Sequence, residues 1–384
     1  MIEADSSHYR RLWIPDLAWI LLLIIVAVVP FLTPSLDLKL LALFYQPGSD
    51  LHPWPFKFNS FFRFFYTLGT LPALLIALAA LGALVAARYR PALKRWRWHA
   101  AFVFLTLVIG PGFFVNTVFK DHWGRPRPKM VTEFRGRMEY QCFYEKGPVG
   151  RGKSFPCGHS SMGYYFVVLY FLARRRRKFI RFSLLAGAMI YGSLIGIARM
   201  ASGAHFASDV LWSAVFPCLA AWVLYYFVLK VPFHEDQPTD LSDTSVWQTK
   251  WLLWIAPLLA GATTAAVLLA TPAFEKIDIN EALPSCSKTV IVEMVVASPS
   301  ERFSDFCFVE QKVTTSSPAR ILISGEVQGF GWPWSRIPYN VAWSQTNGIP
   351  LMRFTCIPKG KFSELDGYLT IEAPPGTQIN RINP

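Results

Sequence analysis

Three short stretches of this chain carry side chains that could bind an anion and react with it. They run from Lys120 to Pro128, from Ser154 to Ser160, and from Arg199 to Asp209. Together they hold several fixed cations, two histidines and a carboxylate. Guanidinium and ammonium groups clamp phosphate oxygens, and an imidazole can act as a nucleophile or a general acid. The collection indicates an anion site with nucleophilic and acid–base groups.

The cations and one glycine would form the binding part of this site. Lys120, Arg127 and Arg199 offer the donors that would hold phosphate oxygens, with arginine binding in bidentate fashion. Gly158 would let the backbone approach the anion closely. Its N–H, near the start of a helix, would add a favourable dipole.

The reactive part would come from two histidines. His205 and Asp209 are four residues apart at the head of an expected helix, so they share one face. Asp209 could accept a hydrogen bond from one imidazole nitrogen and leave the other as the attacking lone pair. His159 belongs to another helix and could protonate the departing oxygen.

Simpler interpretations compete with this one, because basic residues at helix ends usually anchor a membrane interface and a lone histidine is usually structural. The combination of cations, two histidines and a carboxylate in three such stretches nevertheless favours an anion-binding reactive site. We interpret His122 and Arg125 as supporting or solvated residues. A zinc site from His159, His205 and Asp209 has no thiolate pair, and the surrounding cations would repel a metal. We therefore expect neither a metal nor a cofactor.

The composition places these stretches in a membrane protein. Of 384 residues, 53% are hydrophobic and only 16% are charged, against roughly 25% charged in soluble proteins. The first 271 residues hold 28 Lys and Arg against 14 Asp and Glu, and the remainder holds 10 against 11. The positive charge is dispersed between apolar stretches, so a nucleic-acid partner is not expected. A multi-span protein in contact with the bilayer is predicted.

Hydropathy predicts seven membrane spans, the fourth of them short and extended by residues 158–161. Because spans three to six alternate in direction, the three reactive stretches must lie at one face of the membrane. The predicted spans are Leu12–Leu32, Phe64–Ala87, Ala100–Phe119, Ser160–Ala173, Phe182–Ala198, Val210–Val231 and Trp251–Thr271.

Charge patterning bears on orientation. Residues 88–97 carry five basic side chains and residues 174–181 carry six, which favours a cytoplasmic position for both. Residues 120–159, on the opposite side, carry nine basic side chains. The excess of positive charge in cytoplasmic loops therefore determines the orientation only if some of these nine serve the site. On that condition the amino terminus is inside, and the site and the tail are outside.

The tail changes character and predicts a small soluble all-β domain. Residues 329–335 would form a loop rich in aromatic side chains, which either bind a glycan or lipid head group or pack the domain's core. We expect a membrane core over residues 1–231, a linker and seventh helix over 232–271, and the β domain over 272–384. Its predicted strands are Thr289–Val296, Phe306–Glu310, Arg320–Ser324, Tyr339–Trp343, Leu351–Cys356 and Tyr368–Glu372.

The three stretches resemble the signature of the type 2 phosphatidic acid phosphatase superfamily, K-x6-R-P, P-S-G-H and S-R-x5-H-x3-D. The resemblance covers about residues 60–231. It implies an all-α core of six membrane helices, metal-independent hydrolysis, a phosphohistidine on His205 and a leaving-group acid at His159. It also implies phosphate contacts. The matching residues are Lys120, Arg127, Pro128, Pro156, Gly158, His159, Arg199, His205 and Asp209.

Two positions depart from that signature. Cys157 and Ala198 stand where the superfamily has serine, which removes two hydroxyl groups near the phosphate. Cys157 would keep a place in the phosphate-binding set as a weaker donor. Either it forms a disulfide with Cys142 outside the membrane, or it is a small, free, buried residue.

The sequence thus predicts an integral membrane enzyme, a phosphatase of phosphorylated or pyrophosphorylated lipids, without a cofactor. The bacterial inner membrane is the expected location, with the site and the tail on the periplasmic side. A lipid phosphotransferase and a non-catalytic lipid-binding or transport protein are the alternatives. The residues do not indicate which lipid is used or the oligomeric state.

Overall fold

The computed structural model describes residues 2–48, 53–149, 151–236, 271–283, 290–296, 307–313 and 320–382. The chain divides into two compact units, residues 1–250 and 251–384. The predicted seventh span lies outside the described residues except for Thr271, which begins a strand.

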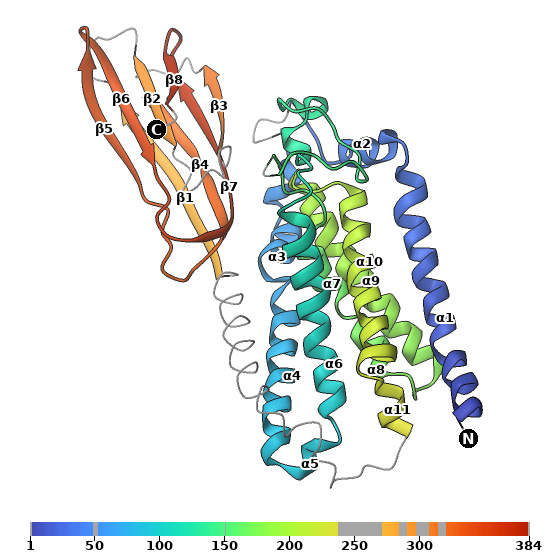
Figure 1. Ribbon diagram of the computed structural model, residues 1–384. Coiled ribbons are helices and arrows are strands. Elements are labelled where there is room, and N and C mark those ends of the chain that lie inside the picture. The colour runs from blue at the N-terminus through green and yellow to red at the C-terminus, as the bar shows by residue number, and fades with distance from the viewer. Residues whose placement is uncertain are drawn as a thin grey trace. The chain divides into compact units, whose positions relative to one another are not determined.

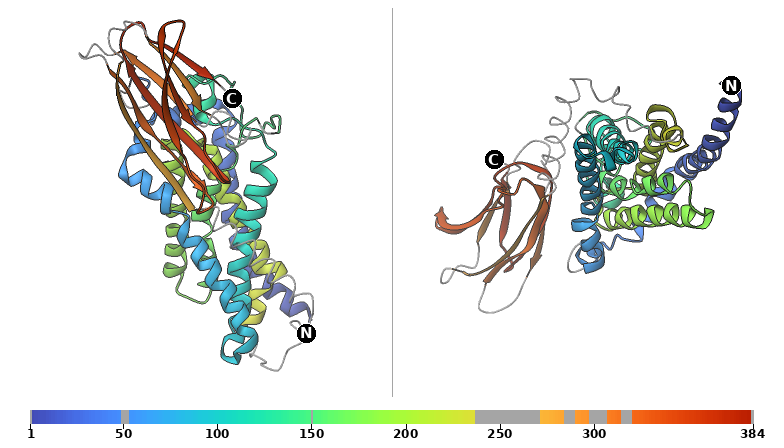
Figure 2. Two further views of the ribbon diagram at one scale, coloured as in Figure 1. Left: turned by 90° about the vertical axis from the view of Figure 1, so that its left-hand side faces the viewer. Right: turned by 90° about the horizontal axis from the view of Figure 1, so that it is seen from below.

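The first unit is a bundle of helices (Figure 1). Within the described residues, five helices are long and apolar enough to cross a membrane, and they correspond to predicted spans one, two, three, five and six. Figure 2 shows several of them nearly end-on, packed side by side. They are Leu12–Phe31, Ser60–Tyr89, Arg97–Lys120, Lys178–Ala201 and Ala207–Val228.

The predicted fourth span is built from two short helices, α7 (Gly158–Tyr164) and α8 (Val167–Leu172). The helix does begin at Gly158, as the sequence predicted. A break at residues 165–166 separates the halves, so neither half alone has the length of a membrane span.

Local sequence sets many helix boundaries. Asn59 caps α3, because its Oδ1 accepts a hydrogen bond from the backbone N–H of Phe61 at 2.9 Å. Arg90 is extended before Pro91 and thereby separates α4 from α5. The remaining helices are α1 (Ile2–Val28), α2 (Pro34–Ala42), α3 (Ser60–Leu68), α4 (Leu71–Tyr89), α5 (Pro91–Lys94), α6 (Arg97–Leu107), α9 (Lys178–Ala201), α10 (Ala207–Val223) and α11 (Val231–Asp236).

Two π-helical segments, wider than an α-helix, continue these helices: η3 (Val108–Lys120) after α6 and η6 (Leu224–Val228) after α10. Pro111 lies inside η3 and cannot donate a backbone hydrogen bond, and Asn116 Nδ2 donates to the Pro111 carbonyl at 2.7 Å. The widened segment ends at Lys120, the first predicted phosphate ligand. Short 3-10 turns occur at Val29–Phe31, Pro55–Phe58, Pro128–Met130 and Thr132–Phe134.

Helices α7 and α9 pack closely through small residues. A Cβ atom on Gly163 would lie 2.6 Å from the Cα of Gly192, so a larger residue would push the helices apart. Ser160 Oγ donates to the Gly192 carbonyl at 2.7 Å across the same contact. This contact holds α7 beside the carboxyl-terminal half of α9.

The second unit contains two four-stranded sheets, in the order β1-β4-β7-β3 and β5-β6-β2-β8. They pack face to face (Figure 2) around a core that includes Ile323, Met352 and Phe354. The turn between β5 and β6 places Asn347 and Gly348 at positive φ, which suits a tight hairpin. The strands are β1 (Thr271–Ala282), β2 (Ile291–Val296), β3 (Cys307–Val313), β4 (Arg320–Gly331), β5 (Tyr339–Thr346), β6 (Ile349–Cys356), β7 (Phe362–Ala373) and β8 (Gln378–Ile382).

The prediction of a β-rich tail is confirmed, with six of these strands overlapping the predicted ones. The sequence analysis missed β1 and β8. In β1 the buried Ile277 and Ile279 alternate with exposed polar residues, a period-two pattern that could have revealed it. Of the predicted aromatic loop, Phe330 is buried inside β4, whereas Trp334 is 64% exposed.

Candidate active site

The three reactive stretches meet at one end of the helical unit, where α2 and the connecting residues 129–149 and 151–153 also lie (Figure 1). His205 lies in the turn between α9 and α10 and is 1% exposed. Asp209 is on the first turn of α10. The Cys157 backbone N–H donates to the Asp209 carbonyl at 3.2 Å, which joins the start of α7 to α10.

The orientation of His205 follows from one short hydrogen bond. Its Nδ1 lies 2.6 Å from the carbonyl oxygen of Ser154. A carbonyl can only accept, so Nδ1 carries the proton and Nε2 keeps the lone pair. Asp209 Oδ2 is 3.7 Å from Nδ1, beyond direct hydrogen-bonding distance. The carbonyl thus takes the hydrogen bond that the sequence analysis assigned to Asp209, which acts on the ring as a nearby charge.

The Asp209 carboxylate is held by other donors. Its Oδ2 accepts from Ser154 Oγ at 2.6 Å and from the Phe206 backbone N–H at 2.8 Å. Its Oδ1 accepts a short hydrogen bond from Arg125 Nη1. Ser154 therefore contacts both His205 and Asp209, although the sequence analysis gave it no role.

Arg125 is a buried residue of this site, and the alternative that it is solvated is wrong. Its Nε donates to the Gln141 carbonyl and its Nη2 to Asp37 Oδ2, each at 2.9 Å. Burial by itself lowers the pKa of the guanidinium, but Asp209 and Asp37 raise it above its usual range. Arg125 therefore stays charged. By contrast, His122 is exposed, as one of the predicted alternatives has it.

Cys157 is a free, fully buried thiol, and Cys142 is free as well, so the predicted disulfide is wrong. The small-buried-residue alternative holds. Burial raises the pKa of the Cys157 thiol, but the adjacent His205 and Arg199 lower it below its ordinary value. Burial likewise lowers the pKa of His205, while Cys157 and Asp209 raise it above its ordinary value. The thiol and the imidazole are thus electrostatically linked.

Gly158 provides a close approach for a cation. A Cβ atom at this position would lie 2.7 Å from Asn116 Oδ1 and 3.3 Å from Lys120 Nζ. The missing side chain lets the end of η3 pack against the start of α7. The structure therefore brings Lys120 and Gly158 together, and it adds Asn116, which the sequence analysis did not single out.

His159 and Arg199 both contact one aromatic ring, that of Tyr66. The Tyr66 ring of α3 stacks on His159 with centroids 5.7 Å apart and an interplanar angle of 13°. The Arg199 guanidinium lies 4.6 Å from the centroid of the same ring. Tyr66 thus links two predicted site residues. It lies in a phenylalanine-rich run whose sequence gave no signal for this role.

Arg127 is fixed on the same side by its backbone. Its carbonyl accepts from Met130 in a tight turn at 2.8 Å, and the next residue but one, Lys129, donates to the Gly203 carbonyl at 3.1 Å. The turn carrying Arg127 therefore packs against the loop that leads into His205.

No three His, Cys, Asp or Glu side chains in the described part of the chain gather as a metal site. The donors that hold Asp209 also occupy the oxygens that a metal would need. The arrangement is a buried imidazole with an adjacent carboxylate and flanking cations.

The sequence model of the PAP2 superfamily matches residues 96–232, which contain all three stretches. The chain is 34% identical over 214 residues to the lipid A 4'-phosphatase of Francisella tularensis subsp. novicida (strain U112), spanning 54% of this chain and 89% of that protein. The chain belongs to the PAP2 superfamily. This membership confirms the resemblance that the motifs indicated.

Two further lipid A 4'-phosphatases match shorter segments. The protein from Rhizobium leguminosarum is 38% identical over 28% of this chain and 45% of its own length. That from Rhizobium etli is 36% identical over 27% of this chain and 40% of its own length. No solved structure matches the chain. Asp37 and Tyr66, which contact the PAP2 motifs, precede the segment that the superfamily model matches.

Proposed function

We propose that this protein removes a phosphate monoester from a membrane lipid by way of a phosphohistidine on His205. Superfamily membership, the lipid A phosphatase relatives and the apolar helices indicate a membrane-bound phosphomonoester hydrolase that acts on lipid phosphates. The hydrogen bond from His205 Nδ1 to the Ser154 carbonyl supports the phosphohistidine mechanism. It fixes the tautomer whose Nε2 lone pair can attack.

The first step forms a bond between His205 Nε2 and phosphorus and breaks the bond from phosphorus to the lipid oxygen. His159 gives that oxygen its proton, so the lipid leaves as an alcohol. The imidazole becomes positive, and the Asp209 carboxylate 3.7 Å from Nδ1 stabilises that charge. Lys120, Arg127 and Arg199, with Gly158 and the Cys157 thiol beside them, would hold the phosphate oxygens.

In the second step a water molecule attacks phosphorus and the bond to Nε2 breaks. His159, now neutral, takes the proton from the water, and inorganic phosphate leaves. His205 returns to its starting state. Both steps use only side chains of this protein, and we expect them to proceed without a metal. Activity abolished by a chelator and restored by zinc or magnesium would contradict this expectation.

The substrate we propose is a glycolipid phosphate of the lipid A type, since the relatives are named for that activity. We place the protein in a bacterial inner membrane, with the site and the tail facing the periplasm. The basic runs at residues 88–97 and 174–181 support this orientation.

Purified protein in detergent should release phosphate from lipid A faster than from undecaprenyl pyrophosphate, phosphatidylglycerophosphate or phosphatidic acid. Lipid carrying radiolabelled phosphate, quenched in base during turnover, should leave acid-labile label on the wild-type protein and none on His205→Ala. A substrate with an isotopically chiral thiophosphate, hydrolysed in labelled water, separates the mechanisms, because two displacements retain configuration at phosphorus and one inverts it. Inversion would overturn the phosphohistidine, whereas absence of turnover on every lipid would overturn the phosphatase itself.

A further inference from the structure

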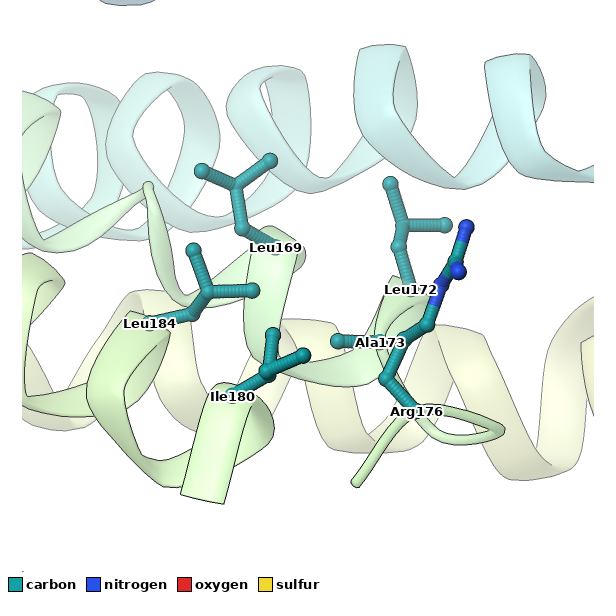
Figure 3. A pocket seen from close by; sticks show the side chains of 6 residues that line it. All are labelled: Leu169, Leu172, Ala173, Arg176, Ile180 and Leu184. Carbon is teal, nitrogen blue, oxygen red and sulfur yellow. The ribbon is translucent and has the colours of Figure 1, made fainter. Parts of the chain in front are cut away.

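A groove of about 380 Å³ lies between α8 and the start of α9, at the end of these helices away from His205. Figure 3 shows leucine side chains on its wall and the long Arg176 side chain extending beside Leu172. The wall is otherwise apolar. The lining residues are Leu169, Leu172, Ala173, Arg176, Ile180 and Leu184.

The start of α9 exposes this groove to lipid. Phe179, Ile180 and Phe182 lie on its first turns and all three are exposed. Exposed apolar side chains on a helix long enough to cross a membrane contact acyl chains. The basic run of residues 174–178, directly before them, belongs at the level of the head groups. The groove therefore lies where acyl chains meet head groups.

Charge favours an anionic head group at this turn. Arg174 pairs with Glu235 at 2.6 Å, and Arg181 pairs with Asp16 at 2.7 Å. Within the described residues, the exposed Arg176 makes no such ion pair, and its guanidinium borders the apolar wall. Phe179 in α9, 82% exposed, follows the basic run of residues 174–178.

We infer that this groove binds one anionic phospholipid from the leaflet opposite the active site. One acyl chain lies along Leu169, Leu172 and Leu184, and the phosphate accepts hydrogen bonds from Arg176. A free phosphate ion has no apolar part that could contact the leucine side chains of the wall, so the ligand is a lipid. This site is separate from the catalytic pocket and is not a substrate site.

The test is native mass spectrometry of the full-length protein after incubation with phosphatidylglycerol or phosphatidylcholine of matched chains. One phosphatidylglycerol should be retained in preference. Arg176→Gln should reduce that retention about fivefold, since one basic residue near a lipid surface contributes on the order of 1 kcal/mol. The neighbouring exposed Arg177, outside the groove, supplies the matched control Arg177→Gln.

A second pair of variants tests the acyl part without changing charge. Ile180→Trp fills the groove and should abolish the preference, whereas Ile190→Trp on the lipid-facing surface of the same helix should leave it intact. Thermal melting checks that each variant is folded. Equal losses in the two arginine variants, no head-group preference, or an unchanged preference in Ile180→Trp would each overturn the site.

A separate observation concerns Asp37 in α2, which is 1% exposed. Its Oδ2 accepts hydrogen bonds from Ser208 Oγ at 2.5 Å, Arg125 Nη2 at 2.9 Å and Tyr140 OH at 3.1 Å. Its Oδ1 accepts from the Ser208 backbone N–H at 2.9 Å. Two of these partners, Arg125 and Ser208, belong to the reactive stretches.

The partner that matters is Arg125, because its guanidinium joins two carboxylates. Nη2 donates to Asp37, while Nη1 donates to Asp209 and, at 2.8 Å, to Ser208 Oγ. Asp37 thus fixes the edge of the guanidinium that faces away from Asp209. We propose that Asp37 is a positioning residue that acts through Arg125 and Asp209 on His205; this inference rests on the proposed function.

Removing the charge of Asp37 should change the pH dependence of turnover. The cluster of Arg125, Asp37 and Asp209 carries a net charge of −1 beside His205. Cys157 and Arg199 also act on this imidazole, the first raising its pKa and the second lowering it. In Asp37→Asn the guanidinium neutralises Asp209 alone. The imidazolium then loses stabilisation, the pKa of His205 falls, and the acidic limb of kcat/KM moves to lower pH.

Asp37→Asn should lower kcat about 10- to 100-fold, since small misplacements of a reacting group have effects of that order. The KM for lipid should change little, because Asp37 does not contact the proposed phosphate pocket. Asp37→Glu should restore part of kcat. Asp16→Asn removes an equally buried carboxylate, whose partners Tyr170, Arg181 and Tyr226 lie outside the site, and should leave both kcat and the pH profile unchanged.

An unchanged acidic limb and kcat in folded Asp37→Asn would overturn the positioning role while His205-dependent turnover still stands. A change confined to KM would overturn it as well. The His205→Ala variant tests the proposed function separately. If this variant turns over normally, the proposed mechanism is wrong, whatever the result for Asp37→Asn.

Discussion

The helical unit contains two buried clusters of similar composition. At the site, Asp37 and Tyr140 hold Arg125; in the other cluster, Asp16 accepts from Tyr170 at 2.5 Å, Tyr226 at 2.6 Å and Arg181 at 2.7 Å. In each case a carboxylate from the amino-terminal segment binds a later arginine. Only the first arginine also reaches a second carboxylate and, through it, a histidine.

The difference shows what separates a structural ion cluster from a catalytic one. The Asp16 cluster closes on itself, since its carboxylate takes one arginine and two hydroxyl groups and joins α1 to α8, α9 and η6. The Asp37 cluster leaves a net negative charge beside a group that can react. A buried arginine that pairs with one carboxylate is thus structural, whereas one whose guanidinium also contacts a second carboxylate beside a reactive group can support catalysis.

The largest expected effect belongs to the residue that makes the first cluster catalytic. His205→Ala should lower kcat at least about 1000-fold, because the nucleophile itself is lost. Phosphate release from the lipid measures this, with melting temperature as the control for folding. Near-normal turnover in this variant would remove the distinction between the two clusters.

His159→Ala should slow hydrolysis about 100-fold for a lipid with a poor leaving group and much less for an activated aryl phosphate. The ratio of kcat between the two substrates measures the acid role. An equal loss on both would assign His159, stacked on Tyr66, to holding phosphate instead of protonating the lipid oxygen.

The second cluster predicts a change in stability without a change in chemistry. Asp16→Asn leaves the partly buried Arg181 without its carboxylate and should lower the free energy of unfolding by about 2 kcal/mol. Thermal denaturation in detergent measures the shift, and turnover per folded molecule should stay within about twofold. A large loss of kcat would show that the Asp16 cluster is coupled to the site.

Cys157→Ser should produce the smallest effect. The neighbouring thiol raises the pKa of His205, and the neutral imidazole is the reactive form. Removing the thiol lowers that pKa, so the acidic limb of kcat/KM should move to lower pH by less than about one unit. The pH–rate profile measures the shift. A limb that moves to higher pH would contradict the assigned sign.

Short-range sequence was sufficient for the reactive stretches, the helical membrane unit and the β-rich tail. Hydropathy and motif spacing are read within a few turns of one helix, and the alternation of spans places three junctions on one face without any contact being known. The same logic left Cys157 open between a disulfide and a free, buried thiol, since two cysteines in one loop say nothing about whether their side chains meet.

The tertiary structure alone decided how the site is held. Asp37 and Ser208 are 171 positions apart, and His205 and Ser154 are 51 apart. No local pattern specifies such pairs, because each depends on how α2, α7 and α10 pack. The contacts of Tyr66 with His159 and Arg199 are of the same kind. The sequence by itself determined which groups could react, and packing decided which buried charges support them.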